Sequence, residues 1–134
     1  MSPPENKVIV QRLMEEGWNQ RNFVVVEEIV GPEHVFHEPS GPQLGTGPEA
    51  YVNRMKLYAG ALDTHFTIED LIAEADRVVV RWTVRGRHNL ELTGITIHRF
   101  EAGKILESWG NWDQLGLMQQ LKQARSSPQA GHSA

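Results

Sequence analysis

The hydrophobic pattern of the chain changes its period near residue 62, and this change limits the possible folds more than any other feature. Before it, apolar residues recur at helical spacing in 5–19 and 48–62. After it, they alternate with polar residues in four runs, 66–72, 78–84, 92–100 and 104–112. Helices therefore precede consecutive strands, which predicts an α+β fold: a curved antiparallel sheet packed on N-terminal helices. Such a cone has an open mouth and encloses a pocket.

The connections between these elements are short. Residues 74–77 and 101–103 suit tight turns. Segment 23–30 is ambiguous: three consecutive valines favour a strand, but Glu27, Glu28 and a following Gly-Pro pair suit the end of a helix, which we predict. Residues 34–38 alternate like a short strand, 40–47 suit a loop, and Asp113 suits the N-cap of a terminal helix. We expect one domain over 1–124 and a disordered tail over 125–134.

Composition excludes several classes of function. The chain has 134 residues, 40% of them hydrophobic and 22% charged, as expected of one soluble domain. Its net charge of −4 argues against nucleic-acid binding. The absence of cysteine excludes disulfides and thiolate metal sites. No secretion signal and no apolar run of about 20 residues is present, so we expect a cytoplasmic protein that does not enter the membrane.

Asp113 is the first candidate for catalysis. Strand alternation places it on the same face as Trp109 and Asn111. A carboxylate beside tryptophans at the end of a strand would be partly desolvated, and desolvation raises its pKa toward the range useful for abstracting a proton. Capping of the terminal helix is the alternative role, and the two roles are compatible.

Seven strings, spread over residues 16–117, match a known family. They are EGWN (16–19), HEPSG (37–41), AEADRV (73–78), RGRH (85–88), GITIHRF (94–100), GKILESW (103–109) and WDQLGL (112–117). The chain resembles the SnoaL-like polyketide cyclases of the NTF2-like superfamily. This resemblance implies the NTF2-like cone, ring closure by an intramolecular aldol reaction without metal or cofactor, and an acid/base aspartate that matches Asp113. It also implies a homodimer through the exposed face of the sheet.

The resemblance leaves room for other functions. The superfamily also contains ketosteroid isomerases, epoxide hydrolases and inert scaffolds, so the fold alone does not choose an activity. The connection 89–93 is shorter than in similar sequences, where a hairpin forms part of the pocket mouth. Its loss would shorten two strands and open the pocket or change what enters it.

The remaining candidates would assist Asp113 or line the pocket. His98 could polarise a carbonyl or move a proton, and Asn111 could donate a hydrogen bond to an enolate oxygen. His37 and His88 match family histidines and could line the mouth. Trp18, Tyr51, Tyr58, Trp82 and Trp109 could form an apolar wall for a flat ligand, although core packing is the simpler explanation. His34 and His37 are three apart on a strand and face opposite ways, so we expect no metal site.

Two classes of function remain. The first is a cofactor-free acid/base enzyme that acts on a small hydrophobic carbonyl compound, with Asp113 as the base and with His98 and Asn111 stabilising the enolate. The second is a module that binds a hydrophobic ligand or dimerises without catalysis. Epoxide hydrolysis is a weaker alternative, because Asp113 and Arg99 supply only part of the required relay.

Overall fold

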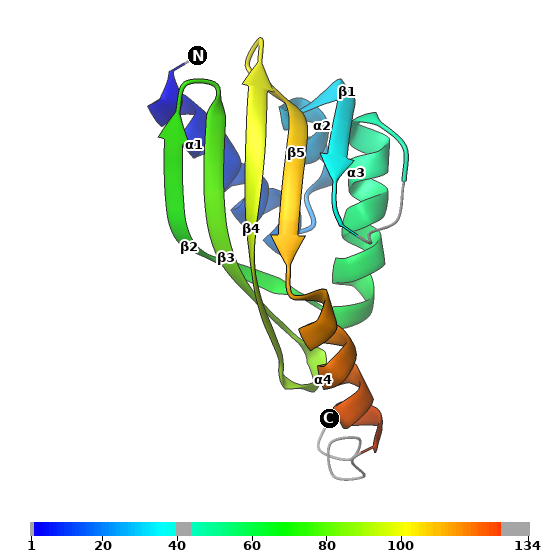
Figure 1. Ribbon diagram of the computed structural model, residues 1–134. Coiled ribbons are helices and arrows are strands. Elements are labelled where there is room, and N and C mark those ends of the chain that lie inside the picture. Colours follow the sequence, from blue (N-terminus) through cyan, green and yellow to red (C-terminus); the bar gives the residue numbers. More distant parts are fainter. Residues whose placement is uncertain (1, 40–43, 127–134) are drawn as a thin grey trace.

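The computed structural model describes residues 2–39 and 44–126, the side chain of residue 126 excepted (Figure 1). Four α-helices are α1 (Pro3–Arg12), α2 (Phe23–Ile29), α3 (Gly47–Met55) and α4 (Gln114–Ser126). Two π-helical turns, η1 (Leu13–Asn19) and η2 (Lys56–Gly60), continue α1 and α3, and η3 (Arg87–Asn89) is a 3-10 turn. The strands are β1 (Val30–His37), β2 (His65–Glu74), β3 (Arg77–Gly86), β4 (Leu90–Glu101) and β5 (Lys104–Trp112). The α+β expectation is confirmed.

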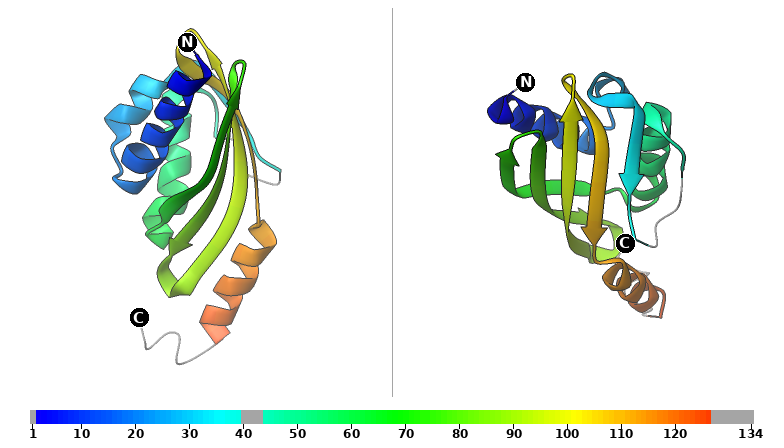
Figure 2. Two further views of the ribbon diagram at one scale, coloured as in Figure 1. Left: turned by 90° about the vertical axis from the view of Figure 1, so that its left-hand side faces the viewer. Right: turned by 45° about the horizontal axis from the view of Figure 1, so that its top comes forward.

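The five strands form one curved sheet in the order β1-β5-β4-β3-β2. Neighbours from β2 to β5 are antiparallel, as predicted, whereas β1 pairs with β5 in parallel. The first three α-helices all cover one face of this sheet, and α4 extends beyond its end (Figure 2). The sheet is therefore mixed and leaves its other face uncovered by helices.

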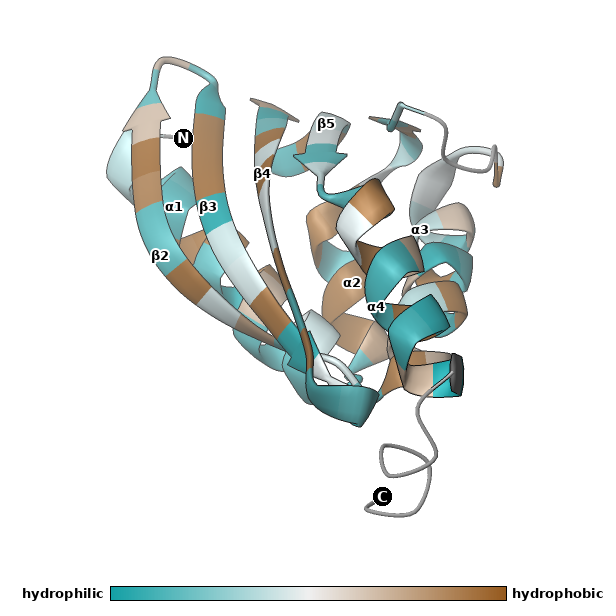
Figure 3. Cartoon of the chain, turned by 60° about the horizontal axis from the view of Figure 1, so that its bottom comes forward, coloured by the Kyte–Doolittle hydropathy of each residue, from teal (hydrophilic) through white to brown (hydrophobic). Residues whose placement is uncertain are grey.

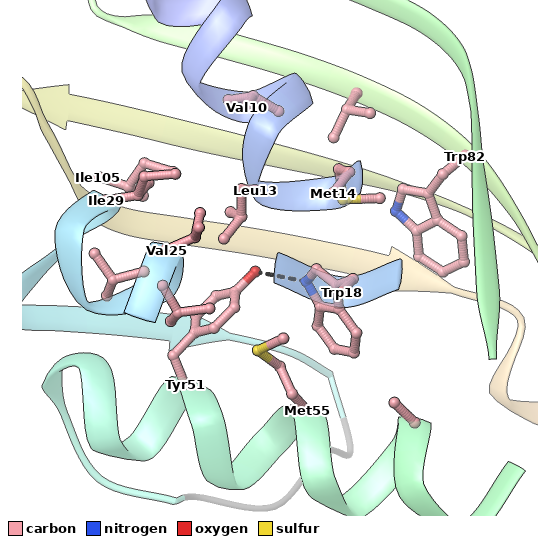
Figure 4. Close-up of a cluster of buried hydrophobic side chains, with 14 of the residues drawn as sticks. Val10, Leu13, Met14, Trp18, Val25, Ile29, Tyr51, Met55, Trp82 and Ile105 are labelled. Carbon is pink, nitrogen blue, oxygen red and sulfur yellow. Dashed lines mark hydrogen bonds between the residues drawn. The ribbon is translucent and has the colours of Figure 1, made fainter. Parts of the chain in front are cut away.

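The helical layer is held by a capped start and a buried apolar stripe. Ser2 and Glu5 form a reciprocal capping box at the beginning of α1, where a proline occupies the first turn. Val10 and Leu13 are fully buried, and Trp18 donates a hydrogen bond from its indole N–H to the Tyr51 hydroxyl at 3.0 Å (Figure 4). This bond ties η1 to α3, so the helices form one wall.

A bulge in β5 sets which side chains face the helices. Arg99 pairs with Glu107 but the next residue, Phe100, pairs with Ile105, so β5 holds one extra residue between them. Ile105 and Ser108 are both buried although they are three residues apart. Because a shift of one residue exchanges the two faces of a strand, Ser108, Gly110 and Trp112 face inward beyond the bulge.

Alternating bands of hydrophobic and hydrophilic residues on β2 and β3 follow the two faces of the sheet (Figure 3). Val78, Val80, Trp82 and Val84 are buried against the helices, whereas Arg81 and Arg85 are exposed. This confirms the alternation inferred for 78–84.

Several element bounds differ from the sequence-based expectations. Strand β1 begins at Val30 rather than at 34, because it joins the edge of β5. The connection after His88 is a compact turn with positive φ at His88 and Asn89, and β3 and β4 keep 10 and 12 residues. Arg125 and Ser126 belong to α4 rather than to the expected tail. The rest of that tail, 127–134, and residues 40–43 of the expected loop lie outside the described residues.

Gly94 offers a test of the packing between β3, β4 and β5. It is paired with Trp82 on one side and Trp112 on the other, and a Cβ atom there would meet both side chains. Gly94→Ala should lower the free energy of unfolding by about 1–3 kcal/mol, because overpacking moves buried rings. Urea unfolding monitored by circular dichroism measures this free energy.

Gly60→Ala is the matched control. A Cβ atom at Gly60 would meet nothing within 4 Å, so this variant should be as stable as the wild type or slightly more stable. Equal stability of both variants would contradict the packing described here.

Candidate active site

A pocket of about 710 Å³, its open mouth included, lies between the helical layer and the inner face of the sheet. Most of its wall is apolar or aromatic: Met14, Trp18, Phe36, Tyr51, Leu62, Phe66, Trp82, Val84, Leu90, Leu92, Trp112 and Leu117. Polar side chains interrupt this wall at Glu38, Arg54, Tyr58, Thr64, Thr96 and His98. An apolar cavity with few polar groups is the usual form of a small-molecule site.

Five of the residues selected from the sequence line this pocket. They are Trp18, Tyr51, Trp82, Tyr58 and His98, and Figure 4 shows the first three around the buried core. Trp82 donates a hydrogen bond from its indole N–H to the Thr96 hydroxyl at 3.0 Å. The tryptophans therefore form walls and also fix polar groups of the pocket.

Asp113, Asn111 and Trp109 do not line the pocket. Asp113 is exposed, and one carboxylate oxygen accepts a hydrogen bond from the Gly116 N–H at 2.8 Å, so Asp113 caps α4 as predicted. Asn111 is exposed and Trp109 is partly exposed on the uncovered face of the sheet. Trp109 and Asn111 share a face of β5, but the bulge in β5 turns that face away from the helices.

His37 and His88 also lie outside the pocket. The His37 ring stacks on Trp109 with 5.5 Å between ring centroids and contacts the Glu107 carboxylate at 2.7 Å. His88 is exposed in the η3 turn. The uncovered face that carries His37 and Trp109 also exposes Ile72 and Ile95. A homodimer through this face stays a prediction.

A buried carboxylate that the sequence reasoning missed organises one side of the pocket. Glu38 accepts hydrogen bonds from Arg54 at 3.0 Å, Tyr58 at 3.0 Å and the Trp112 indole at 3.1 Å. The side chains of Arg54 and Glu38 are only 5% and 4% exposed. The carboxylate and the guanidinium thus neutralise each other inside the protein.

His98 belongs to a second buried polar group. The Ser108 hydroxyl lies 2.7 Å from Nδ1 of His98 and 2.9 Å from Nε2 of His34, and all three residues are at most 2% exposed. Burial lowers the pKa of His98 to about 3, and neighbouring His34 adds to this effect. Burial, followed by the charge of Arg54, lowers the pKa of His34 to about 4. Both rings are neutral at pH 7.

The wall of the pocket therefore carries no net charge. Burial raises the pKa of Tyr51 and of Tyr58 to about 12, so both phenols are protonated. Glu38 and Arg54 cancel, and His98 is neutral. A neutral wall favours a neutral ligand, because an unpaired charge inside it would lose its hydration without compensation.

Thr64 carries a polar atom without a partner in the described part of the chain. It lines the pocket, is 5% exposed, and its hydroxyl makes no hydrogen bond with any described residue. Buried hydroxyls are usually hydrogen-bonded, so this group is available to a ligand or to water.

In the described residues, no three His, Cys, Asp or Glu side chains gather into a metal site. No described helix is long and apolar enough to cross a membrane.

The model of the SnoaL-like polyketide cyclase family matches residues 8–121. The chain belongs to this family. A comparison with curated proteins gave no match. The match covers the helical layer from residue 8 onward, all five strands and most of α4, so every wall of the pocket lies within the region that defines the family.

Solved structures of similar proteins share this SnoaL-like fold. A proposed polyketide cyclase from Acidithiobacillus ferrooxidans is 27% identical, with a TM-score of 0.81 over 92% of this chain and 99% of that one. A proposed polyketide cyclase from Bacillus cereus is 28% identical, with a TM-score of 0.75 over 85% and 78%. AclR, a proposed hydroxylase from Streptomyces galilaeus, is 21% identical, with a TM-score of 0.77 over 91% and 98%, and shows the fold alone.

The pocket residues that sequence reasoning missed carried weak signals. Glu38 directly precedes a proline and lies within one of the matching strings, but nothing local shows that it is buried. Arg54 lies four residues before Tyr58, which was selected as an aromatic wall residue, and this spacing of one helical face could have suggested a joint role. Ser108 and Trp112 are assigned to the inner face only once the bulge is known.

The two buried histidines predict a loss of stability in acid. In the unfolded chain they protonate near pH 6.5, whereas in the folded protein they protonate near 3 and 4. Between pH 6.5 and about 4 the unfolded chain therefore binds more protons, and the free energy of unfolding falls as the pH falls. Each histidine removes up to about 1.4 kcal/mol per pH unit.

The measurement is urea unfolding from pH 7 to pH 4 for the wild type, His98→Gln and His88→Gln. The first variant should lose stability less steeply than the wild type, because one titrating group is gone. The second should follow the wild-type curve, because His88 is exposed. An unchanged slope in His98→Gln would contradict a buried neutral imidazole.

Proposed function

We propose that this SnoaL-like protein is a cofactor-free acid/base catalyst that enolises a neutral, hydrophobic carbonyl compound, closing a ring or shifting a double bond. The observation that carries this proposal is His98, a neutral imidazole in the wall of an apolar pocket. Its Nδ1 contacts Ser108, and no described residue bonds to its Nε2. A neutral imidazole with an unpaired Nε2 can accept a proton from a ketone bound beside it.

Thr96 supplies the second group that enolisation requires. It lies two residues before His98 on β4, so both side chains project from the same face about 7 Å apart. Its hydroxyl accepts a hydrogen bond from Trp82, and no described residue accepts the hydroxyl hydrogen. That hydrogen is available to an oxygen on which negative charge develops.

The reaction then follows from these two positions. Nε2 of His98 removes a proton from the carbon next to a carbonyl, and Thr96 holds the resulting enolate oxygen. In ring closure, the enolate carbon attacks a second carbonyl of the same molecule, and the new alkoxide takes the proton back from His98. The product is an isomer of the substrate, so no other reactant is consumed. The apolar walls hold the substrate and exclude water from the enolate.

The proposal assigns proton transfer to His98 rather than to Asp113. The Asp113 carboxylate is exposed, is bonded to the Gly116 N–H and does not line the pocket. The similarity to two proposed polyketide cyclases at 27% and 28% identity supports carbonyl chemistry in this pocket. The alternative of a ligand-binding module without catalysis predicts occupancy of the same pocket with no proton transfer.

Enolisation can be tested without knowing the natural substrate. A panel of neutral polycyclic ketones and 1,3-diketones is incubated with the protein in D₂O, and exchange of the α-protons is followed by NMR. His98→Gln should slow exchange by about 10²–10⁴-fold, since it removes the general base. Asp113→Asn should exchange at the wild-type rate. Thermal unfolding of each variant verifies that it is folded.

The opposite result, exchange lost in Asp113→Asn and kept in His98→Gln, would return the role of base to Asp113. Saturable binding of a ketone to the wild type with no exchange in any member of the panel would favour the ligand-binding module. Tryptophan fluorescence reports such binding, because Trp18, Trp82 and Trp112 all line the pocket.

A further inference from the structure

The Ser108 hydroxyl joins two imidazoles that come from different strands. It lies 2.7 Å from Nδ1 of His98 on β4 and 2.9 Å from Nε2 of His34 on β1, and Ser108 itself is fully buried. In chain order the two contacts span 10 and 74 residues, so neither is a local turn contact. His34 does not line the pocket, and its ring makes edge-to-face contacts with Tyr51 and Phe36.

A serine hydroxyl has one hydrogen, and this limits how His98, Ser108 and His34 can hydrogen-bond to one another. If Nδ1 of His98 donates to Ser108, the hydroxyl donates to Nε2 of His34, and both rings carry their proton on Nδ1. If the hydroxyl donates to His98 instead, Nε2 of His34 donates to the serine, and both rings carry their proton on Nε2. A third arrangement, in which both rings donate to the serine oxygen, leaves the serine hydrogen without an acceptor among the described residues. In the two arrangements that use every hydrogen, the two neutral histidines therefore have the same tautomer.

We propose that Ser108 and His34 form a buried relay that sets the tautomer of His98 and shares its proton. In the first state, Nε2 of His98 has a free lone pair toward the pocket and is a base. In the second state, Nε2 of His98 carries a hydrogen and is an acid. Ser108 and His34 are thus positioning residues, which act on a substrate only through His98. This inference rests on the proposed function for its catalytic consequence but not for the coupling of the tautomers.

The relay returns every proton that it takes up. A substrate proton arrives at Nε2 of His98, the Nδ1 hydrogen of His98 moves to Ser108, and the serine hydrogen moves to Nε2 of His34. His98 and Ser108 are neutral again, and His34 carries the extra proton. When the alkoxide of the product takes the hydrogen from Nε2 of His98, both shifts reverse and the starting state returns. No group outside the chain is required.

The surroundings of the relay fit a transient rather than a resting charge at His34. Arg54 on α3 and His37 on β1 disfavour a positive charge there, whereas Glu107 on β5 favours one. A proton on His34 in turn disfavours a proton on His98. The balance of these groups keeps both rings neutral before a substrate binds.

The first test is a measurement on the free protein, independent of any substrate. The chain has six histidines, and ¹⁵N labelling of their rings with long-range ¹H–¹⁵N correlation assigns the tautomer of each. Spectra of His34→Gln and His98→Gln identify the two signals. We expect the same tautomer in both rings of the wild type. Opposite tautomers, or a doubly protonated resting ring at pH 7, would overturn the proposal.

The second test removes the hydroxyl. Ser108→Ala should uncouple the tautomers and lower kcat for α-proton exchange at least about tenfold, with little change in KM, because the pocket wall is intact. Thr83→Val is the matched control: Thr83 is 6% exposed, hydrogen-bonds Glu69 and does not line the pocket. It should leave exchange and both tautomers unchanged. A wild-type kcat in Ser108→Ala would exclude the relay.

The two tests separate this inference from the proposed function. If no ketone exchanges with the wild type but the two rings share a tautomer that Ser108→Ala uncouples, the coupling stands and the enolisation proposal fails. If exchange depends on His98 but the tautomers are independent, the enolisation proposal stands and the relay fails.

Discussion

The bulge in β5 decides which chemistry faces the pocket. Ile105 is buried in the core, so an unbroken strand would have turned Trp109 and Asn111 inward with it. The extra residue reverses the alternation and directs Ser108, Gly110 and Trp112 to the inner face. Ser108 then meets His98 and His34, and Trp112 meets Glu38. Both polar groups of the site thus depend on one inserted residue.

The two buried polar groups, one around Glu38 and one around Ser108, satisfy their hydrogen bonds in different ways. The pocket is largely apolar, so each buried polar side chain needs a partner. Glu38 and Arg54 pair their charges, and Tyr58 and Trp112 add donors to the carboxylate. The histidine group carries no charge and satisfies itself through one hydroxyl. The first group holds its charges in a fixed arrangement, whereas the second can move protons without leaving a charge on the pocket wall.

The sequence predicted the fold well because the fold follows from periodicity and turn residues. The change of period near residue 62, the helix at 23–29 and the Asp113 cap all depend on local patterns that the structure confirms. The site depends on longer-range features. The parallel pairing of β1, which brings His34 to Ser108, and the bulge in β5 have no local signature in composition or spacing. Trp18, Tyr51, Tyr58 and Trp82 were found because their strand or helix phase was correct. His98 was selected as a possible partner of Asp113, which does not line the pocket.

The string WDQLGL at 112–117, which carries much of the family resemblance, can be explained without catalysis. Trp112 donates to the buried carboxylate of Glu38, and Asp113 caps α4. A Cβ atom at Gly116 would meet the Asp113 carboxylate, so a larger residue there would shift the capping side chain. Leu117 then turns back to the pocket wall. A chain can therefore keep this string for the geometry of its last helix, and the string by itself does not identify the base. Under the proposed function, the base lies instead on the inner face of the sheet, where the His98 imidazole lines the pocket.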